Sequence, residues 1–192
     1  MSTPTVTAPA SATAVTAEER TSAALDALSK LPQDAFVARL EGIFEHSPWV
    51  AERAWSAGPF RSIDALHAAM CLAVDTADSK EQLGLICAHP ELAGKEAEEG
   101  TLTTASTGEQ RGAGLDQCST AELQRLRSLN AAYRAHFGFP YVIAVKGVSR
   151  YQIMDALEAR LANDRATEFR VCLAQIARIA RFRLDALLGP AT

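Results

Sequence analysis

Residues 119–138 read STAELQRLRSLNAAYRAHFG. Ser119 and Glu122 have the S-x-x-E pattern of a capping box, in which each side chain accepts a hydrogen bond from the other residue's backbone N–H. Gly138 is a typical C-terminal stop. Between these signals lies an apolar stripe at helical spacing, made of Leu123, Leu126, Leu129, Tyr133 and Phe137. The stretch therefore predicts a long amphipathic helix.

The same signals recur on both sides of this stretch, whereas signals for strands hardly occur. Towards the N-terminus we expect helices that start at Thr16 with Glu19, at Asp34 and running to Phe44, at Ser47-Pro48, at Ser62, at Ser79 with Gln82, and near Ser106. Towards the C-terminus we expect helices that start at Ser149 with Gln152 and at Thr167, the last ending at Gly189-Pro190. Segment 96–104 is acidic and then Thr-rich, which is typical of a surface loop. The fold class is thus all-α, a single-domain multi-helix bundle.

One segment departs from the helical pattern. Residues 139–145 read FPYVIAV, which is continuously apolar and partly β-branched. A run this short is not a typical helix, so we expect a buried extended segment.

Composition excludes several classes of protein. A chain of 192 residues with a hydrophobic fraction of 48% can form one domain with its own core, and a net charge of -4 leaves no basic footprint for nucleic acid. No uncharged apolar run approaches the roughly 20 residues that cross a bilayer. We expect a disordered tail over residues 1–17 and a helical domain over 18–190. The tail lacks the features of a signal peptide, which favours a cytoplasmic location.

Cysteine and histidine usage gives no sign of a metal site. The four cysteines are widely spaced and are interpreted as reduced, small core residues: Cys71, Cys87, Cys118 and Cys172. The four histidines are not spaced as zinc ligands usually are, and His67 is interpreted as structural.

His89 is the first candidate for chemistry, because it follows the helix expected from Ser79 and directly precedes Pro90. A residue before proline is pushed out of helical geometry, and the C-terminal end of a helix favours a protonated imidazole. This predicts a proton donor near neutral pH. The alternative is that His89 only satisfies the last helical carbonyls.

Ser106, Glu109 and Gln110 form a second candidate group. The S-x-x-E spacing is a sufficient structural explanation as a capping box. The functional interpretation is compatible with it, because a helix N-terminus can hold a polar or anionic ligand and Gln110 offers both a donor and an acceptor.

Arg183 lies where an apolar residue is expected, because the stripe Cys172, Ile176 and Ile179 of the last helix continues to it. A buried guanidinium needs an anion. That anion is either an acidic side chain of the protein or the carboxylate of a substrate held in a bidentate fork.

Taken together, these residues give the chain a resemblance to the 2-oxo-4-hydroxy-4-carboxy-5-ureidoimidazoline (OHCU) decarboxylase family, from about Leu25 to Leu188. The motifs that carry it occur in order and with fitting separations: Leu31 to Phe36, His89 to Lys95, Ser106-x-x-Glu109-Gln110, Asn130-x-x-Tyr133 leading to Phe137-Gly-Phe-Pro140, and Ile179 to Leu184. Glu91 and Tyr141 depart from the family pattern, in which aspartate and phenylalanine are common.

The resemblance implies an all-helical homodimer that decarboxylates OHCU to (S)-allantoin without a cofactor. It implies that His89 is the catalytic acid and that Glu109 and Arg183 act with it. The substrate-binding set that it implies is Pro90, Ser106, Glu109, Gln110, Arg183 and the backbone of Tyr141, Val142, Ile143, Ala144 and Val145.

Two other functions compete with this one. An enzyme on the same scaffold could act on a related imidazoline or hydantoin. A non-catalytic helical interaction module would be expected to have lost His89, Glu109 or Arg183, and all three are present.

Overall fold

The computed structural model describes residues 16–189, and within them the regular structure is entirely helical. The ten α-helices of this part are α1 (Ala17–Ser29), α2 (Gln33–Arg39), α3 (Trp49–Ala54), α4 (Ile63–Asp75), α5 (Ser79–Cys87), α6 (Lys95–Glu99), α7 (Thr104–Gly112), α8 (Thr120–Phe137), α9 (Arg150–Arg160) and α10 (Arg165–Leu188). Two 3-10 turns cover Trp55–Ala57 and Leu115–Gln117. The predicted all-α class is confirmed.

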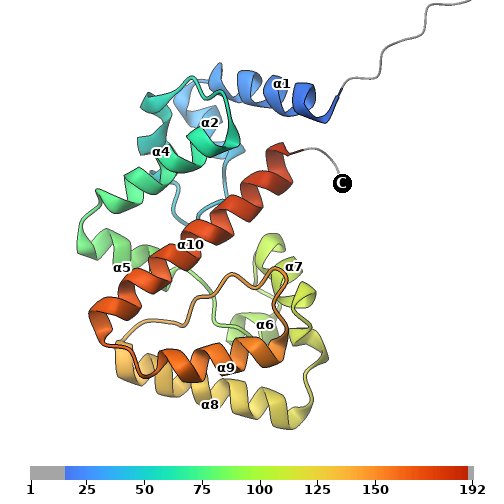
Figure 1. Ribbon diagram of the computed structural model, residues 1–192, viewed down its shortest axis with the longest axis vertical. Helices are drawn as coiled ribbons and strands as arrows, with labels where there is room; N and C mark the ends of the chain where they lie inside the picture. The colour runs from blue at the N-terminus through green and yellow to red at the C-terminus, as the bar shows by residue number, and fades with distance from the viewer. Residues whose placement is uncertain (1–15, 190–192) are drawn as a thin grey trace, which may run out of the picture.

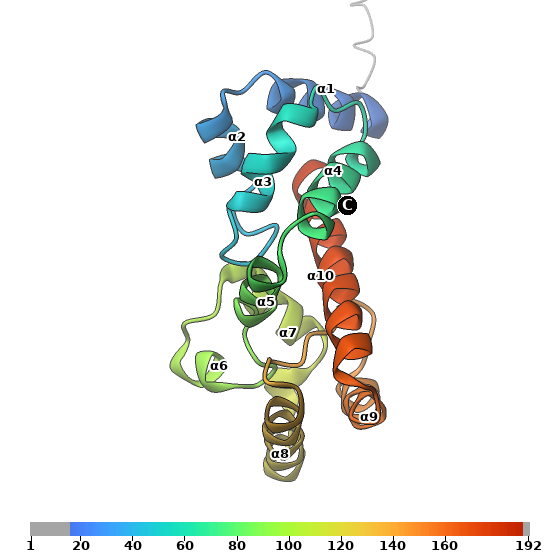
Figure 2. The same cartoon turned by 90° about the vertical axis from the view of Figure 1, so that its left-hand side faces the viewer.

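Helix α10 is the central element of the bundle. Figure 1 shows it crossing the molecule diagonally, with α1 to α4 around its C-terminal half and α8 and α9 at its N-terminal end. The view in Figure 2, turned by 90°, shows α5 and α7 beside the middle of α10. Residues at the middle of α10 can therefore contact chain segments from both halves of the sequence.

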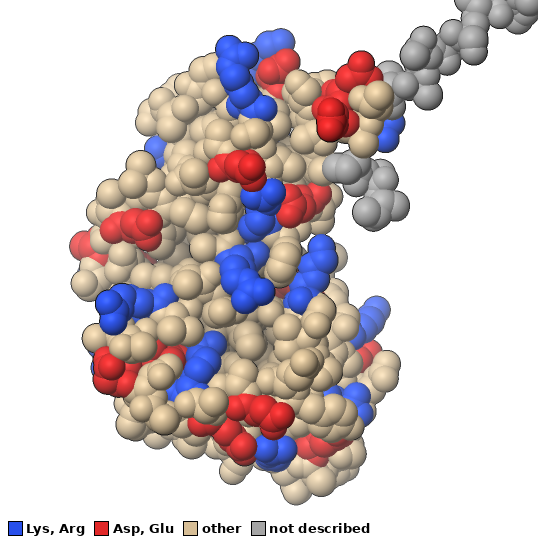
Figure 3. All heavy atoms as spheres, in the orientation of Figure 1, with Lys and Arg blue, Asp and Glu red and all other residues tan. Residues whose placement is uncertain are grey.

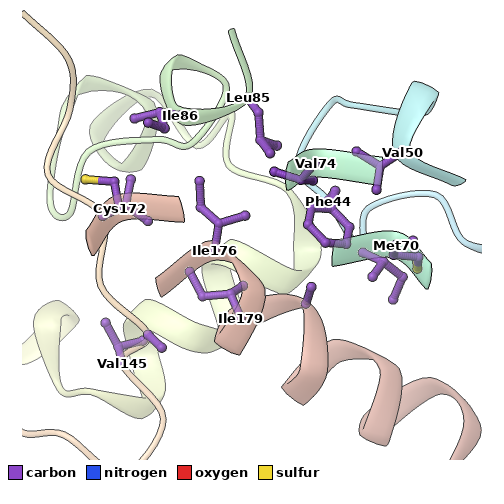
Figure 4. Packing of buried hydrophobic residues seen from close by; sticks show 14 of the residues in the cluster. Phe44, Val50, Met70, Val74, Leu85, Ile86, Val145, Cys172, Ile176 and Ile179 are labelled. Carbon is purple, nitrogen blue, oxygen red and sulfur yellow. The ribbon is translucent and has the colours of Figure 1, made fainter. Parts of the chain in front are cut away.

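The core forms along the apolar stripe of α10. Cys172, Ile176 and Ile179 are almost fully buried, and Figure 4 shows them together with Leu85 and Ile86 of α5. Burying one such aliphatic side chain contributes about 1.5 to 3 kcal/mol. The stripe that predicted the last helix is thus the face that holds α10 against α5.

Four of the predicted helix starts are confirmed by cap geometry. Capping boxes are present at Thr16 with Glu19, at Ser119 with Glu122 and at Ser149 with Gln152, and the Ser62 side chain accepts a hydrogen bond from the N–H of Ala65. Gly138 ends α8 in the left-handed region, with φ 80°. Residues 140–145 then run without helix or strand and are buried except for Ile143, as expected for segment 139–145.

Two predicted starts were wrong because a neighbouring aspartate is the cap. Asp78, paired with Glu81 in a capping box, begins α5 in place of Ser79. Asp164 begins α10 in place of Thr167, whose N–H donates to the Asp164 side chain. The aspartate lies one residue before the expected start in α5 and three residues before it in α10, and it accepts hydrogen bonds from free N–H groups of the first turn.

The segment from Asp34 to Phe44 also differs from the prediction. Pro32 is the N-cap of α2, so Asp34 lies in its first turn, and the helix ends at Arg39. Gly42 has φ 80°, a left-handed conformation that stops the helix before Phe44. The expected loop 96–104 contains the short helix α6, which ends at the left-handed Gly100.

The remaining structural expectations have mixed outcomes. Residues 1–15 of the expected tail 1–17 lie outside the described residues, while Thr16 and Ala17 begin α1. All four cysteines are free, but only Cys172 is buried and Cys87 is exposed. His67 has the structural role expected of it, because its Nε2 bonds the carbonyl of Ala177 at 2.8 Å.

Two surface properties bear on the expected partners. Between residues 16 and 189, no helix combines the length and the hydrophobicity needed to cross a membrane. On the face shown in Figure 3, Lys and Arg side chains are interspersed with Asp and Glu.

Candidate active site

A pocket lies where the loop after α5, the face of α7, segment 139–145 and α10 meet. It is lined by every predicted site residue except Ala144, namely His89, Pro90, Ser106, Glu109, Gln110, Tyr141, Val142, Ile143, Val145 and Arg183. Leu92 and Ile179 complete the lining. The structure therefore gathers into one place residues that are far apart in the sequence.

His89 enters the pocket just beyond the end of α5, with 6% of its surface exposed. Its Nδ1 lies 2.9 Å from the carbonyl oxygen of Leu85. A carbonyl only accepts hydrogen bonds, so Nδ1 carries a proton. Nε2 is buried and has no hydrogen-bond partner among residues 16–189. In the neutral ring, Nε2 is thus an unoccupied acceptor at the pocket.

The pKa of His89 is opposite to the sequence-based expectation. Burial lowers it to about 4, outweighing the hydrogen bond to Leu85 and the nearby charge of Glu45, which both raise it. Desolvation penalises the charged imidazolium more than the end of one short helix favours it. His89, which the sequence predicted to be a protonated donor, is therefore a neutral imidazole near neutral pH.

Helix α7 supplies the polar side of the pocket. Its N-cap is Thr103, whose side chain accepts a hydrogen bond from the N–H of Ser106 at 3.2 Å. The prediction that Ser106 and Glu109 form a capping box was therefore wrong. Both lie inside the helix, and with Gln110 they share the face that lines the pocket, because residues three and four apart are neighbours on a helix.

Arg183 is buried, with 8% of its surface exposed, as its place on the α10 stripe predicted. Its Nε and Nη2 bind the two carboxylate oxygens of Glu109 at 2.7 and 2.9 Å, forming a bidentate fork. Nη2 also lies 3.3 Å from the Ser106 hydroxyl. Burial lowers the pKa of Arg183, but hydrogen bonds and charges from Glu109 and Glu45 raise it above its ordinary value, so the guanidinium is charged.

Glu45 is a site residue that sequence reasoning missed. It lies in the turn after α2, is 1% exposed, and binds Nη1 of Arg183 at 2.5 Å. It also accepts hydrogen bonds from the hydroxyls of Thr103 at 2.8 Å and Ser106 at 3.2 Å. Burial raises the pKa of Glu45, but the charge and hydrogen bond of Arg183 outweigh burial and hold the pKa below its ordinary value.

The loop that carries Pro90 is fixed from two sides. The Oε1 of Gln110 accepts from the N–H of Ala93 at 2.9 Å, and the Nδ2 of Asn130 donates to the carbonyl of Leu92 at 3.0 Å. Ala93 has φ 50°, a conformation that L-residues adopt at a cost. Because Oε1 of Gln110 is used in this way, its NH₂ group is the part of the amide that remains for a ligand.

Segment 139–145 is held from the side of α9 and α10. Arg160 donates to the carbonyl of Val142 at 2.8 Å, and the N–H of Ala144 donates to Gln175 at 3.0 Å. In an extended chain, alternate residues point their backbone groups in opposite directions. Because Val142 and Ala144 use backbone groups on the side of α9 and α10, we expect the N–H groups of Ile143 and Val145, which both line the pocket, to face it.

Tyr141, which stands where phenylalanine was expected, carries its extra hydroxyl towards α9. Its hydroxyl lies 3.5 Å from the carbonyl of Ile153 in α9, a long contact. The hydroxyl is thus on the α9 side, where it does not narrow the pocket.

The pocket is small. Its volume is about 30 Å³, which is enough for roughly two water molecules. A neighbouring groove of about 390 Å³ shares Glu109, Val145, Ile179 and Arg183 with it. A ring-sized ligand therefore needs lining side chains to move, and the four shared residues form the boundary with the larger space.

Comparisons with known proteins show what this chain is similar to. The model of the OHCU decarboxylase family matches residues 29–185. A 2-oxo-4-hydroxy-4-carboxy-5-ureidoimidazoline decarboxylase of Haloferax volcanii is 43% identical over 160 residues, covering 83% of this chain and 93% of the relative. A uric acid degradation bifunctional protein of Bacillus subtilis is 42% identical over 160 residues, which are 83% of this chain and 32% of that protein.

This chain is also similar to solved structures. A crystal structure of (S)-allantoin synthase aligns with a TM-score of 0.68 and 31% identity, covering 85% of this chain and 53% of that chain, so this chain spans about half of its length. An OHCU decarboxylase crystallised in the presence of (S)-allantoin aligns with a TM-score of 0.59 and 21% identity, over 76% of this chain and 94% of that chain. At that identity, the second match supports the fold alone.

Proposed function

The chain belongs to the OHCU decarboxylase family, and we propose from this premise that its pocket removes the carboxyl group of OHCU and yields (S)-allantoin. The matched residues 29–185 include the whole candidate site, from Glu45 to Arg183. The function is thus a carboxy-lyase reaction in the breakdown of urate.

The substrate name defines the chemistry. C4 of the imidazoline carries both the hydroxyl and the carboxyl group and is saturated, so the ring double bond joins C5 to N1. When the carboxylate leaves as carbon dioxide, the electron pair of the broken bond forms C4=C5. The former C5=N1 pair moves to N1, which takes up a proton from the solvent. The resulting enol becomes allantoin when its hydroxyl loses a proton and C5 gains one.

His89 is suited to the last two proton transfers. Its neutral ring presents Nε2 as an acceptor, which takes the proton from the C4 hydroxyl. The imidazolium then donates that proton to C5, and it can do so from one face of the ring only. A positioned acid or base of this kind contributes a factor of about 100 to 10,000. One-sided delivery also accounts for a single enantiomer of the product.

The surrounding donors orient the substrate and stabilise negative charge. Arg183 provides a guanidinium for the carboxylate, and the N–H groups of Ile143 and Val145 with the NH₂ of Gln110 face the ring and ureido group. Preorganised donors of this kind each stabilise a transition state by about 3 to 4 kcal/mol. Glu109 lies on Arg183 and reaches the same pocket, where it can accept a hydrogen bond from the substrate hydroxyl or ureido group.

The observation that carries the proposal is the pairing of an unoccupied, buried Nε2 on His89 with the charged Arg183 in one pocket. The test is release of labelled carbon dioxide from OHCU that carries ¹³C in its carboxyl group. We expect release well above the spontaneous rate in the presence of the protein. Release at the spontaneous rate would contradict the proposal and favour a non-catalytic role.

The homodimer implied by the resemblance stays a prediction. Sedimentation of the purified chain tests it directly, because a monomer and a dimer differ twofold in mass.

A further inference from the structure

The guanidinium of Arg183 has no N–H group left for a substrate. Nε and Nη2 are engaged by Glu109, Nη2 also by Ser106, and Nη1 by Glu45 and by the carbonyl of Gly42 at 2.6 Å. These contacts account for all five donors of the side chain. A substrate carboxylate can therefore bind Arg183 in a fork only if one of the present partners leaves.

The two carboxylates differ in how firmly they are held. Glu45 is 1% exposed, and besides Nη1 of Arg183 it has two further hydrogen-bond donors, the hydroxyls of Thr103 and Ser106. Glu109 keeps 28% of its side chain exposed, and Arg183 is the partner that its carboxylate binds. Removing Glu45 from Arg183 would leave a buried charge without its cation, which is costly.

Glu109 and Glu45 also differ in their position relative to the pocket. Glu109 lines both the pocket and the neighbouring groove, whereas Glu45 lines neither and lies behind Arg183 and Ser106. A ligand that arrives through the pocket or the groove meets Glu109 first. The edge of Arg183 that Glu109 covers, Nε with Nη2, already holds one carboxylate in a bidentate fork, so it fits a substrate carboxylate as well.

We propose that Glu45 is a positioning residue that holds the Nη1 side of Arg183 permanently, while the substrate carboxylate replaces Glu109 on the Nε and Nη2 side. The inference rests on the proposed function, because that function supplies a carboxylate-bearing substrate. Displaced in this way, Glu109 moves next to the substrate and opens the wall that the pocket shares with the groove.

The test uses a stable probe, 2-oxoimidazolidine-4-carboxylate. It has the ring urea and the C4 carboxylate of the substrate but no C=N bond beside the carboxylate, so it does not decarboxylate. Its dissociation constant is measured calorimetrically with the wild-type chain, Glu45→Gln and Glu109→Gln. Glu122→Gln, which removes a carboxylate from an ion pair with Arg150 outside the site, is the matched control.

The two site variants are expected to change affinity in opposite directions. Glu45→Gln leaves Glu109 as the sole counter-ion of a loosened Arg183, so probe binding weakens by about tenfold or more. Glu109→Gln removes the competitor for the fork, so binding tightens by about threefold or more. The KM for OHCU follows the same order, and Glu122→Gln binds the probe as the wild type does.

Equal weakening by both site variants would overturn the exchange of partners. Unchanged probe affinity in Glu45→Gln, with only a lower melting temperature, would overturn the positioning role. If Glu45→Gln does not fold, a crystal structure of the wild-type chain with the probe decides. The expected complex has the probe on Nε and Nη2 with Glu45 still on Nη1, and an intact pair of Glu109 with Arg183 overturns the proposal.

These measurements separate the inference from the proposed function. Probe binding involves no turnover, so exchange of partners without decarboxylation of OHCU would contradict the function and leave the exchange standing. Decarboxylation of OHCU with Glu109 still bound to Arg183 would contradict the exchange of partners and leave the proposed function standing.

Discussion

The Nδ1 of His89 lies 2.9 Å from the carbonyl oxygen of Leu85, one helical turn before it in the sequence. This contact sets the tautomer of the ring, because Nδ1 must carry the proton and Nε2 is left as an acceptor. Burial then keeps the ring neutral by lowering its pKa to about 4. The site thus begins its cycle with a base, and the acid that protonates carbon forms during the reaction.

The pH dependence of turnover follows from this protonation state. Because the neutral imidazole is the active form, kcat/KM should stay level from neutral pH into the mildly acidic range and decline as the pH falls through about 4, the folded pKa of His89. Initial rates, corrected for spontaneous decay of OHCU at each pH, provide the measurement. A decline centred near the ordinary pKa of 6.5 would show that the ring is not desolvated as the structure indicates.

His89 also makes the stability of the fold depend on pH. Its pKa is about 4 when folded and 6.5 in the reference state, so the unfolded chain binds the proton first as the pH falls. The contribution is complete above the unfolded pKa and is lost between there and the folded pKa, amounting to about 3 kcal/mol. Urea unfolding at neutral pH and near pH 4 should show a loss of stability that is about 3 kcal/mol larger in the wild type than in His89→Asn. Equal losses in both proteins would assign the effect to other groups.

Removing the guanidinium should expose the cost of the buried carboxylates. Arg183→Met leaves Glu45 buried without a cation, so we expect a loss of about 3 to 5 kcal/mol in the free energy of unfolding and loss of turnover. Adding Glu45→Gln to Arg183→Met should recover part of the stability and none of the turnover. If Arg183→Met alone were more stable than the wild type and fully active, both the cost of the buried Glu45 charge and the substrate role of Arg183 would be contradicted.

The support of segment 139–145 can be tested at Gln175. Gln175→Leu leaves the N–H of Ala144 without its acceptor, which should cost about 1 to 3 kcal/mol of stability and raise KM, because the segment's pocket-facing N–H groups lose their alignment. Gln82→Leu is the matched control, since it removes the hydrogen bond that Gln82 of α5 donates to the carbonyl of Val74 in α4. It should lower stability and leave KM unchanged. A KM that rises equally in both variants would point to general loosening of the fold.

Most of the fold could be predicted because helix signals are local. A cap, an apolar stripe and a C-terminal glycine lie within one stretch of chain, as in residues 119–138, so the sequence alone carries them. The predictions failed where two neighbouring residues compete for one role. Asp78 and Ser79 are both good caps, and so are Asp164 and Thr167, and the choice depends on where the preceding chain enters the helix.

The site was predicted in part, because its members are joined by contacts distant in sequence. The stripe of α10 predicted that Arg183 is buried and needs an anion. It did not reveal that Glu45 is one of the two acidic partners, since Glu45 follows a turn at Gly42 that breaks helical spacing. The predicted charge of His89 was wrong for a related reason. The sequence shows the helix end that favours a protonated ring, but it does not show the burial that lowers the pKa by more.

The central claim is that neutral His89 accepts and returns one proton from a single face of the substrate. A circular-dichroism time course tests it most directly, with OHCU generated in situ from urate by urate oxidase and hydroxyisourate hydrolase. We expect the wild-type chain to speed the appearance of the (S)-allantoin signal, His89→Asn to lose this effect by a factor of about 100 or more, and the exposed control His136→Asn to keep it. Formation of (S)-allantoin by His89→Asn at the wild-type rate would contradict the account.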